Sequence, residues 1–559
     1  MNLVIGISFV CLILLITVTA NTITPYVKIY DEDAAPYKEM PPLNLNPKEK
    51  EKQYWQDQAA NTLEAKLKRK LNTNVAKNII FFLGDGLSVT TITAARIYQG
   101  QLKNRSGEEE KLFFETFSDT GLSKTYCLDK QVADSACTAT AYMCGVKANF
   151  QTIGVTGEVE VSDCEKAKLE SNRVSSILKW SQDAGKATGV VTTARVTHAS
   201  PAGCYAHVPF RDMESDGDIE KYKLDQNSCN FDIAKQLIYE DPGKNINVIM
   251  GGGRGKFLPK DEKNSTYGSG SRLDKNLIEE WKNDKALRKA NAVYVSNITE
   301  LKQVDPTKTD YLLGLFATSH MNYNLEKKPE EPTLTEMTEM AIKILQKNPN
   351  GFYLFVEGAK IDMAHHEDAA RMALDETLQF AEAIEKAYSL TKEEDTLIVV
   401  TADHAHTMTM SGYPDRGYNI LGLFGKSKDN LPYSTLSYAN GPGYHMEKAP
   451  GVRFNLENDH LDEHNYTYPA LVPKYYESHG GDDVAVYANG PWSHLFSGNY
   501  EQNYIPIAEA YAAGISPSNS KISPRNSVAR TSATTSVVFL FIFNFIFSVF
   551  FKKLNFFAI

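Results

Sequence analysis

Short, mainly apolar runs recur along this chain, and they constrain its fold more than any other feature. Each run is too short to be a typical helix, and strands that are apolar on both faces belong to parallel sheets covered by helices. A helical period from His366 to Tyr388 lies between two of the runs. The alternation predicts an α/β fold with a mostly parallel central sheet. The runs span residues 78–83, 188–193, 352–356, 396–400 and 484–488.

Acidic and imidazole side chains follow four of these runs. They are Asp85; His198, with Ser200; Glu357, Asp362, His365 and His366; and Asp403, His404 and His406. Ligands of open α/β sheets bind at the carboxyl ends of the strands, so we expect these groups to meet at one edge. Carboxylates gathered there would repel one another unless divalent cations neutralised them. Histidine-containing sets favour zinc, and sets of oxygen ligands favour magnesium.

A serine near the start of a helix is the candidate nucleophile. Ser135 follows Asp134 and is followed by small residues that continue as a helix, where free N–H groups favour an anion. The same position suits a simple helix-capping serine. No G-x-S-x-G motif supports a Ser-His-Asp hydrolase, and a metal beside Ser135 could lower the pKa of its hydroxyl in place of a histidine base.

Charge and the chain ends narrow the functional class. A net charge of −10 gives no support for nucleic-acid binding. Residues 1–20 are apolar and end in small residues, which predicts a signal peptide although a positive n-region is missing. Near the other end, the apolar run at 537–551 is short for a membrane span and follows a small, polar spacer. This pattern predicts a GPI-attachment signal, with Asn526 as the preferred site, on the extracellular face of the plasma membrane. A single C-terminal span is the alternative.

Secretion agrees with the sequons and cysteines. Four sequons lie at Asn104, Asn264, Asn297 and Asn465. Six cysteines remain once Cys11 leaves with the signal peptide, and an oxidising compartment permits disulfides. None of their spacings resembles a zinc finger.

The segment 134–140 resembles the nucleophile signature of alkaline phosphatases. The resemblance extends from about Trp55 to Tyr511 and follows the animal, membrane-anchored branch. Other segments resemble the metal-binding motifs of the family: 82–86, 197–203, 356–358, 361–362 with 365–366, and 401–404. The resemblance implies a three-layer α/β sandwich with a mostly parallel central sheet and a crown insertion.

The resemblance also implies a site and an activity. One zinc would be held by Asp362, His366 and His479; a second by Asp85, Asp403 and His404, in contact with Ser135; and magnesium by Asp85, Ser200 and Glu357. Arg211 would bind phosphate oxygens, and His198, His365 and His406 would support the ligands. Cys164 would pair with Cys229. The implied reaction is hydrolysis of small phosphate monoesters through a phosphoserine, with an alkaline pH optimum, in a homodimer.

Six segments are expected on this basis. They are a signal peptide at 1–20, an N-terminal arm and helix at 21–76, the metal-binding phosphatase domain at 77–412, a crown-like insertion at 413–477, a return to the core at 478–515, and the spacer and hydrophobic tail at 516–559.

Some positions depart from the vertebrate pattern. Cys137 adds bulk and a thiol two residues after Ser135, and Met363 stands where vertebrate members have histidine. Ala317 replaces an acidic ligand, which makes a calcium site doubtful. The alternatives are a phosphodiesterase or a sulfatase of the same superfamily, and a GPI-anchored binding protein without activity. The Pro of the sulfatase motif is missing after Ser135. The sequence does not name the physiological substrate.

Overall fold

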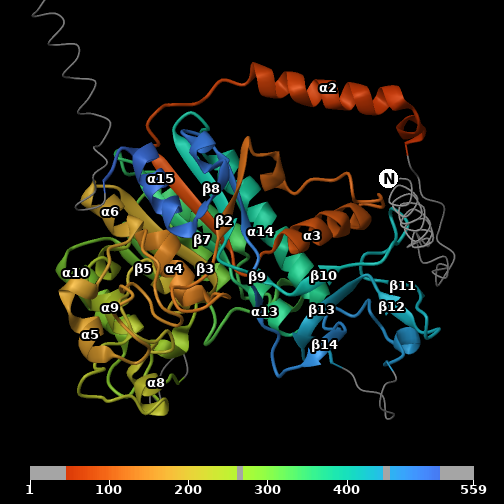
Figure 1. Ribbon diagram of the computed structural model, residues 1–559. Helices are drawn as coiled ribbons and strands as arrows, with labels where there is room; N and C mark the ends of the chain where they lie inside the picture. Colours follow the sequence, from red (N-terminus) through yellow and green to blue (C-terminus); the bar gives the residue numbers. More distant parts are fainter. Residues whose placement is uncertain (1–45, 261–268, 445–452, 517–559) are drawn as a thin grey trace, which may run out of the picture.

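A ten-stranded sheet forms the centre of the molecule (Figure 1). The computed structural model describes residues 46–260, 269–444 and 453–516. The strand order is β17-β2-β16-β8-β1-β7-β3-β4-β6-β5. The strands are β1 (Asn78–Gly84), β2 (Asp119–Lys124), β3 (Ala187–Arg195), β4 (Val248–Gly252), β5 (Ala292–Val295), β6 (Tyr311–Leu315), β7 (Phe352–Gly358), β8 (Thr396–Ala402), β16 (Val484–Asn489) and β17 (Gly498–Glu501).

Most neighbours in this sheet are parallel. The central strand β1 pairs in parallel with β7 and β8, and β3 pairs in parallel with β7 and β4. The exception is β16, which is antiparallel to both β8 and β2. The five predicted apolar runs all lie in strands, and the expected mostly parallel α/β fold is confirmed.

Alternate residues of β1 pack into two separate hydrophobic cores. Phe81 belongs to the core that contains α4 and α15, whereas Phe82 belongs to the core that contains α3 and α14. This two-residue alternation makes the sheet the middle layer between two layers of helices. The helices of the first core are α4 (Ser135–Cys144), α6 (Ile177–Asp183), α9 (Ile233–Tyr239), α10 (Leu277–Leu287) and α15 (Ile505–Ala513); those of the second are α3 (Val89–Leu102), α12 (Leu334–Leu345) and α14 (Ala370–Leu390).

Shorter helices complete the chain. They are α5 (Cys164–Lys168), α7 (Ala199–Ala202), α8 (Asp216–Lys221), α11 (Ile298–Gln303) and α13 (Lys360–His366). The periodic segment that begins at His366 is divided between α13 and α14, because Asp368 has a left-handed backbone with φ of 53° that breaks the helix.

The N-terminal helix α2 (Lys52–Lys68) extends beside the body of the molecule (Figure 1). None of its residues is buried. Within the described ranges, no helix is both long and apolar enough to span a membrane.

The described part of the segment that was expected to be an insertion contributes to two small sheets. One contains β10 (Met408–Met410), β13 (Leu436–Gly441) and β14 (Ala470–Pro473), and the other contains β11 (Leu423–Lys426) and β12 (Pro432–Ser434). The first sheet therefore begins a few residues before the expected boundary at 413. The predicted signal peptide, most of the N-terminal arm, Asn264, Asn526 and the hydrophobic tail lie outside the described residues.

Glu509 is a buried carboxyl in the hydrophobic layer behind the sheet. Its side chain on α15 is 0% exposed, and neither carboxyl oxygen has a hydrogen-bond partner among the described residues. Burial raises the pKa of Glu509 well above its ordinary value. The group is therefore held protonated in the folded chain.

We expect Glu509→Leu to stabilise the protein, and to do so more strongly as pH rises. Glu509 keeps a proton in the folded state that the unfolded chain releases above about pH 4.3. Folding stability therefore falls by about 1.4 kcal/mol per pH unit until the raised pKa is passed. Thermal unfolding with metals in excess should show a larger gain in Tm at about pH 9 than at about pH 6.5. Glu509→Gln, which cannot ionise, is the matched control. An equal gain for Glu509→Leu at both pH values would contradict the explanation.

Candidate functional site

The predicted site residues meet at the carboxyl edge of the sheet. Asp85 follows β1, Glu357 is the penultimate residue of β7, and Asp403 follows β8. Ser200 lies on α7, shortly after β3. Neighbouring parallel strands end together here, since Gly84 is in register with both Gly358 and Ala402.

Asp362, His366 and His479 form the first group. Asp362 and His366 are four residues apart on α13, so they project from one face. His479 reaches them from β15 (His479–Gly480), which pairs with β9 (Ala405–His406). The Nε2 atoms of both histidines lie 3.4 Å from Asp362 Oδ1 and 3.1 Å from each other.

The hydrogen bonds of the two histidine rings leave their Nε2 atoms free to bind a cation. The carbonyls of Glu477 and Ala133 can only accept, so His366 Nδ1 donates to the first (2.6 Å) and His479 Nδ1 donates to the second (2.7 Å). In neutral rings both Nε2 atoms then carry lone pairs that face one another and the carboxylate of Asp362. A zinc ion is the natural partner of two imidazole nitrogens and one carboxylate oxygen.

The second group contains Asp85, Asp403 and His404, and it adjoins Ser135. His404 Nε2 lies 3.6 Å from Asp85 Oδ1 and 3.1 Å from Asp403 Oδ2. Ser135 Oγ lies 3.2 Å from the same nitrogen. All four side chains are nearly or fully buried.

The third group shares Asp85 with the second. Asp85, Glu357 and Ser200 are 0% exposed, and both Asp85 oxygens, Glu357 Oε1 and Ser200 Oγ have no hydrogen-bond partner among the described residues. Thr192 donates to the other Glu357 oxygen. Several orphaned oxygens in a buried place are unfavourable by themselves and suit a magnesium ion.

Electrostatics favours cations at this edge. Burial, followed by the negative charges of Asp403 and Asp362, raises the pKa of Asp85 well above its ordinary value. Burial also raises the pKa of Glu357 to about 7. The raised pKa values mean that burial and neighbouring carboxylates disfavour negative charge at these groups. Divalent cations bound here would offset that effect.

Arg211 contacts Asp134, the residue before the predicted nucleophile Ser135. It donates to Asp134 Oδ2 at 3.0 Å and to His198 Nε2 at 3.1 Å. Asp134 also caps α4, since its Oδ1 accepts from the Cys137 N–H. Asp134 therefore orients both the helix that begins at Ser135 and the side chain of Arg211.

A buried acidic residue that the sequence analysis missed supports the first group. His406 Nε2 donates to Asp362 Oδ1 at 2.6 Å, and His406 Nδ1 donates to Glu477 Oε2. Although burial alone would lower it, the charge of Glu477 and the hydrogen bond to Asp362 raise the pKa of His406 to about 10. Glu477 lies two residues before His479, and that proximity was the available signal.

The other supporting histidines differ in their surroundings. His365 lies between Thr91 Oγ1 (2.9 Å) and the Tyr438 hydroxyl (2.8 Å), so it connects α3 to the insertion. His198 contacts Arg211 and packs edge-on against His320, with ring centroids 5.2 Å apart. The sequence analysis did not single out His320.

The cysteines form two disulfides among the described residues. Cys164 is bonded to Cys229, and Cys127 is bonded to Cys137. The expectation of a thiol at Cys137 is therefore wrong, because its partner lies ten residues earlier in the sequence. Of the sequons, Asn104 and Asn465 are exposed, and Asn297 caps α11.

The family profile and the most similar known sequences give one family. A family profile described as alkaline phosphatase matches residues 76–515. The chain is 48% identical over 478 residues to a tissue-nonspecific alkaline phosphatase of Rattus norvegicus, covering 84% of this chain and 90% of that protein. It is 45% identical over 477 residues to a membrane-bound alkaline phosphatase of Bombyx mori, covering 84% and 86%.

Solved structures agree in fold. The alkaline phosphatase of Thermus thermophilus has a TM-score of 0.57 at 21% identity, covering 85% of this chain and 98% of that one. The enzyme of the Antarctic bacterium TAB5 has a TM-score of 0.54 at 22% identity, covering 79% and 99%. With the family profile and the long, close match to animal enzymes, these results show that the chain belongs to the alkaline phosphatase family and is a phosphoric monoester hydrolase.

Proposed function

We propose that Ser135 is the nucleophile and that hydrolysis proceeds through a phosphoserine. The supporting observation is the position of Ser135 Oγ, 3.2 Å from His404 Nε2, at the first turn of α4 and at the border of the second group. Attack on phosphorus would form the Ser135 Oγ–P bond as the alcohol leaves, and water would then cleave that bond. Two displacements in succession retain configuration at phosphorus.

Positive and partly positive groups of the chain would hold the phosphoryl group during both steps. The Arg211 guanidinium would bind two phosphate oxygens. Free N–H groups at the start of α4 would face the same oxygens. Because Asp134 fixes Arg211 in position, little ordering is left to be done when substrate binds.

We further propose that two zinc ions and one magnesium ion occupy the three groups. Asp362, His366 and His479 would hold one zinc; Asp85, Asp403 and His404 the other, beside Ser135; and Asp85, Ser200 and Glu357 the magnesium. Bound there, the cations would supply positive charge next to the attacking and leaving oxygens. The orphaned oxygens and facing lone pairs support these assignments. Calcium is not included, since Ala317 offers no side-chain oxygen.

The ligands give the reaction its alkaline preference. A carboxylate must be deprotonated to bind a cation. Burial raises the pKa of Glu357 to about 7 and raises that of Asp85, so protons would compete with the cations for these carboxylates as the pH falls. Deprotonation of the Ser135 hydroxyl is favoured in the same direction.

Ser135→Ala should abolish hydrolysis of an aryl phosphate. We expect a loss of about a thousandfold or more in kcat, because the covalent route disappears. In wild type a chelator should remove activity, zinc with magnesium should restore it, and the rate should rise from neutral to alkaline pH. Ser176→Ala, at the buried cap of α6, is the matched control. Unchanged turnover in Ser135→Ala would contradict the proposal.

We also propose that the mature protein is GPI-anchored on the outer face of the plasma membrane. The apolar run at 537–551 and its polar spacer support this assignment, and a relative from Bombyx mori is described as membrane-bound.

A phosphatidylinositol-specific phospholipase should release the activity from membranes of expressing cells. A GPI anchor is cut by that enzyme, whereas a protein span is not. We would measure phosphatase activity in the supernatant, with a transmembrane-anchored fusion of residues 21–515 as control. Activity that stays with the membranes after treatment would favour the single C-terminal span.

A homodimer is the third part of the proposal. Helix α2 has no buried residue, and Leu63 and Leu67 are 59% and 76% exposed. Most helical stability in proteins comes from packing of an apolar face against a neighbour. We infer that a second copy of the chain covers it.

Leu63→Glu with Leu67→Glu should weaken the dimer, because charges would replace the apolar side chains. Sedimentation of the soluble wild-type ectodomain should give twice the mass of one chain, and the variant should shift toward monomer at low concentration. The matched control is Glu64→Gln on the same helix. A monomeric wild-type ectodomain would refute the dimer.

A further inference from the structure

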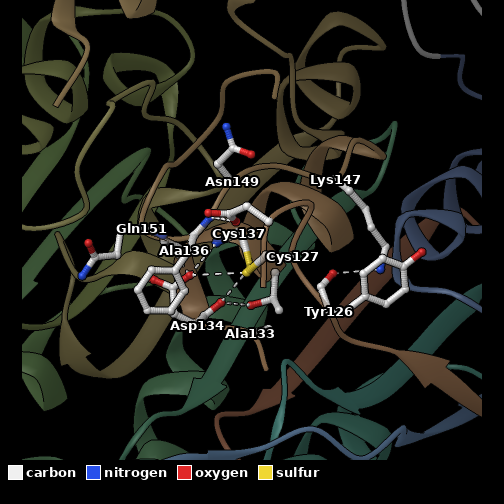
Figure 2. The surroundings of a disulfide bond; sticks show 12 residues. Tyr126, Cys127, Ala133, Asp134, Ala136, Cys137, Lys147, Asn149 and Gln151 are labelled. Atoms are coloured by element: carbon white, nitrogen blue, oxygen red, sulfur yellow. Dashed lines mark hydrogen bonds between the residues drawn. A yellow bond between two sulfur atoms is a disulfide. The ribbon is translucent and has the colours of Figure 1, made fainter. Parts of the chain in front are cut away.

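A disulfide lies beside Ala133 and Asp134, the two residues before the proposed nucleophile Ser135 (Figure 2). Cys127 follows β2, and Cys137 is the third residue of α4. Both cysteines are 2% exposed. The bond therefore closes a loop that contains Ala133, Asp134 and Ser135.

Two residues of this loop orient groups of the site. The Ala133 carbonyl accepts from His479 Nδ1 at 2.7 Å, which leaves His479 Nε2 aimed at Asp362. Asp134 Oδ2 accepts from Arg211 at 3.0 Å. A shift of this short stretch would move an imidazole, a guanidinium and the serine together.

The two sulfur atoms contact this stretch. Cys137 Sγ lies 3.4 Å from the Asp134 carbonyl oxygen, and Cys127 Sγ lies 4.0 Å from Asp134 Oδ1. That same oxygen accepts from the N–H groups of Cys137 (3.3 Å) and Gln151 (3.1 Å). Ala133 packs with both cysteines in a small apolar cluster.

Hydrogen bonds hold the start of the loop before Ala133: the Leu128 N–H donates to the Ala148 carbonyl (3.0 Å), and Asp129 Oδ1 accepts from the Phe150 N–H (2.8 Å). Residues 128–132 are exposed and belong to no helix or strand. An exposed loop keeps conformational freedom unless something restricts it, and a cross-link across it removes much of that freedom.

We propose that the Cys127–Cys137 disulfide is a positioning element of the active site, which holds Ala133 and Asp134 so that His479 and Arg211 keep their orientation. The proposal rests on the function proposed for those two residues. Loss of an outer partner of a metal ligand typically weakens metal binding or activity by about ten- to a hundredfold. Removal of this disulfide should weaken both phosphate binding and metal retention by amounts in that range.

The test compares Cys127→Ser/Cys137→Ser with Cys164→Ser/Cys229→Ser, which removes the other disulfide. Each protein is loaded with zinc and magnesium and studied well below its unfolding temperature. Two quantities are measured: the inhibition constant of inorganic phosphate and the rate of zinc release to a coloured chelator. We expect both to rise about tenfold or more in the first variant. The control should lose thermal stability but keep both near wild type.

A merely stabilising disulfide would lower Tm and leave both quantities unchanged, and that result would overturn the proposal. Asp134→Asn in the wild-type and Cys127→Ser/Cys137→Ser backgrounds gives a second test. Its effect on phosphate inhibition should be smaller in the second background, because both changes act through Arg211. Strict additivity would contradict the proposed route.

Cys127→Ala/Cys137→Ala is measured in the same way if the serine variant does not fold. The outcomes are separable from those of the proposed function. Chelator-insensitive wild-type activity, or full activity in Ser135→Ala, would remove the proposed function itself. Normal phosphate inhibition and zinc release in a disulfide-free protein that still needs Ser135 would remove only the positioning role.

Discussion

Mutual repulsion among buried acidic groups at one sheet edge is the constraint on which the rest of this structure depends. Asp85, Glu357 and Asp403 are 0% exposed and close together, and each has at least one carboxylate oxygen without a hydrogen-bond partner among the described residues. A buried group of like charges is tolerated only with neutralisation by protons or cations. With the cations and the Arg211 contact proposed above, positive charge at this edge would let an acidic chain bind an anionic substrate.

Much of the fold and of the site could be predicted from the sequence, because both depend on local patterns. The run at 78–83 is apolar on both faces, and its successive residues alternate between two different cores, as a central parallel strand requires. The acidic residues that follow such strands meet because parallel strands end at a common edge. His479 was placed only through the family resemblance, since it reaches the site from a two-residue strand beyond the insertion.

The remaining features depend on contacts between distant segments. Glu477 looks like an ordinary surface acid in the sequence, but it is buried against His406, seventy-one positions earlier in the chain. The Cys127–Cys137 bond could not be deduced, because six cysteines allow many pairings and neither residue lies in a recognised spacing. The apolar run in β16 looks like the runs in the parallel strands of the sheet. An apolar run does not indicate the direction of its strand, so the antiparallel pairing of β16 could not be predicted.

The pairing of β15 with β9 bears on how this family can diversify. His479 is in register with His406, so the chain leaves the core and returns to it at one point. The chain between them, residues 407–478, begins and ends where these two strands pair. The cost of closing such a loop grows only slowly with its length. Changes of length between the two paired ends should therefore cost little, while His406 and His479 keep their places.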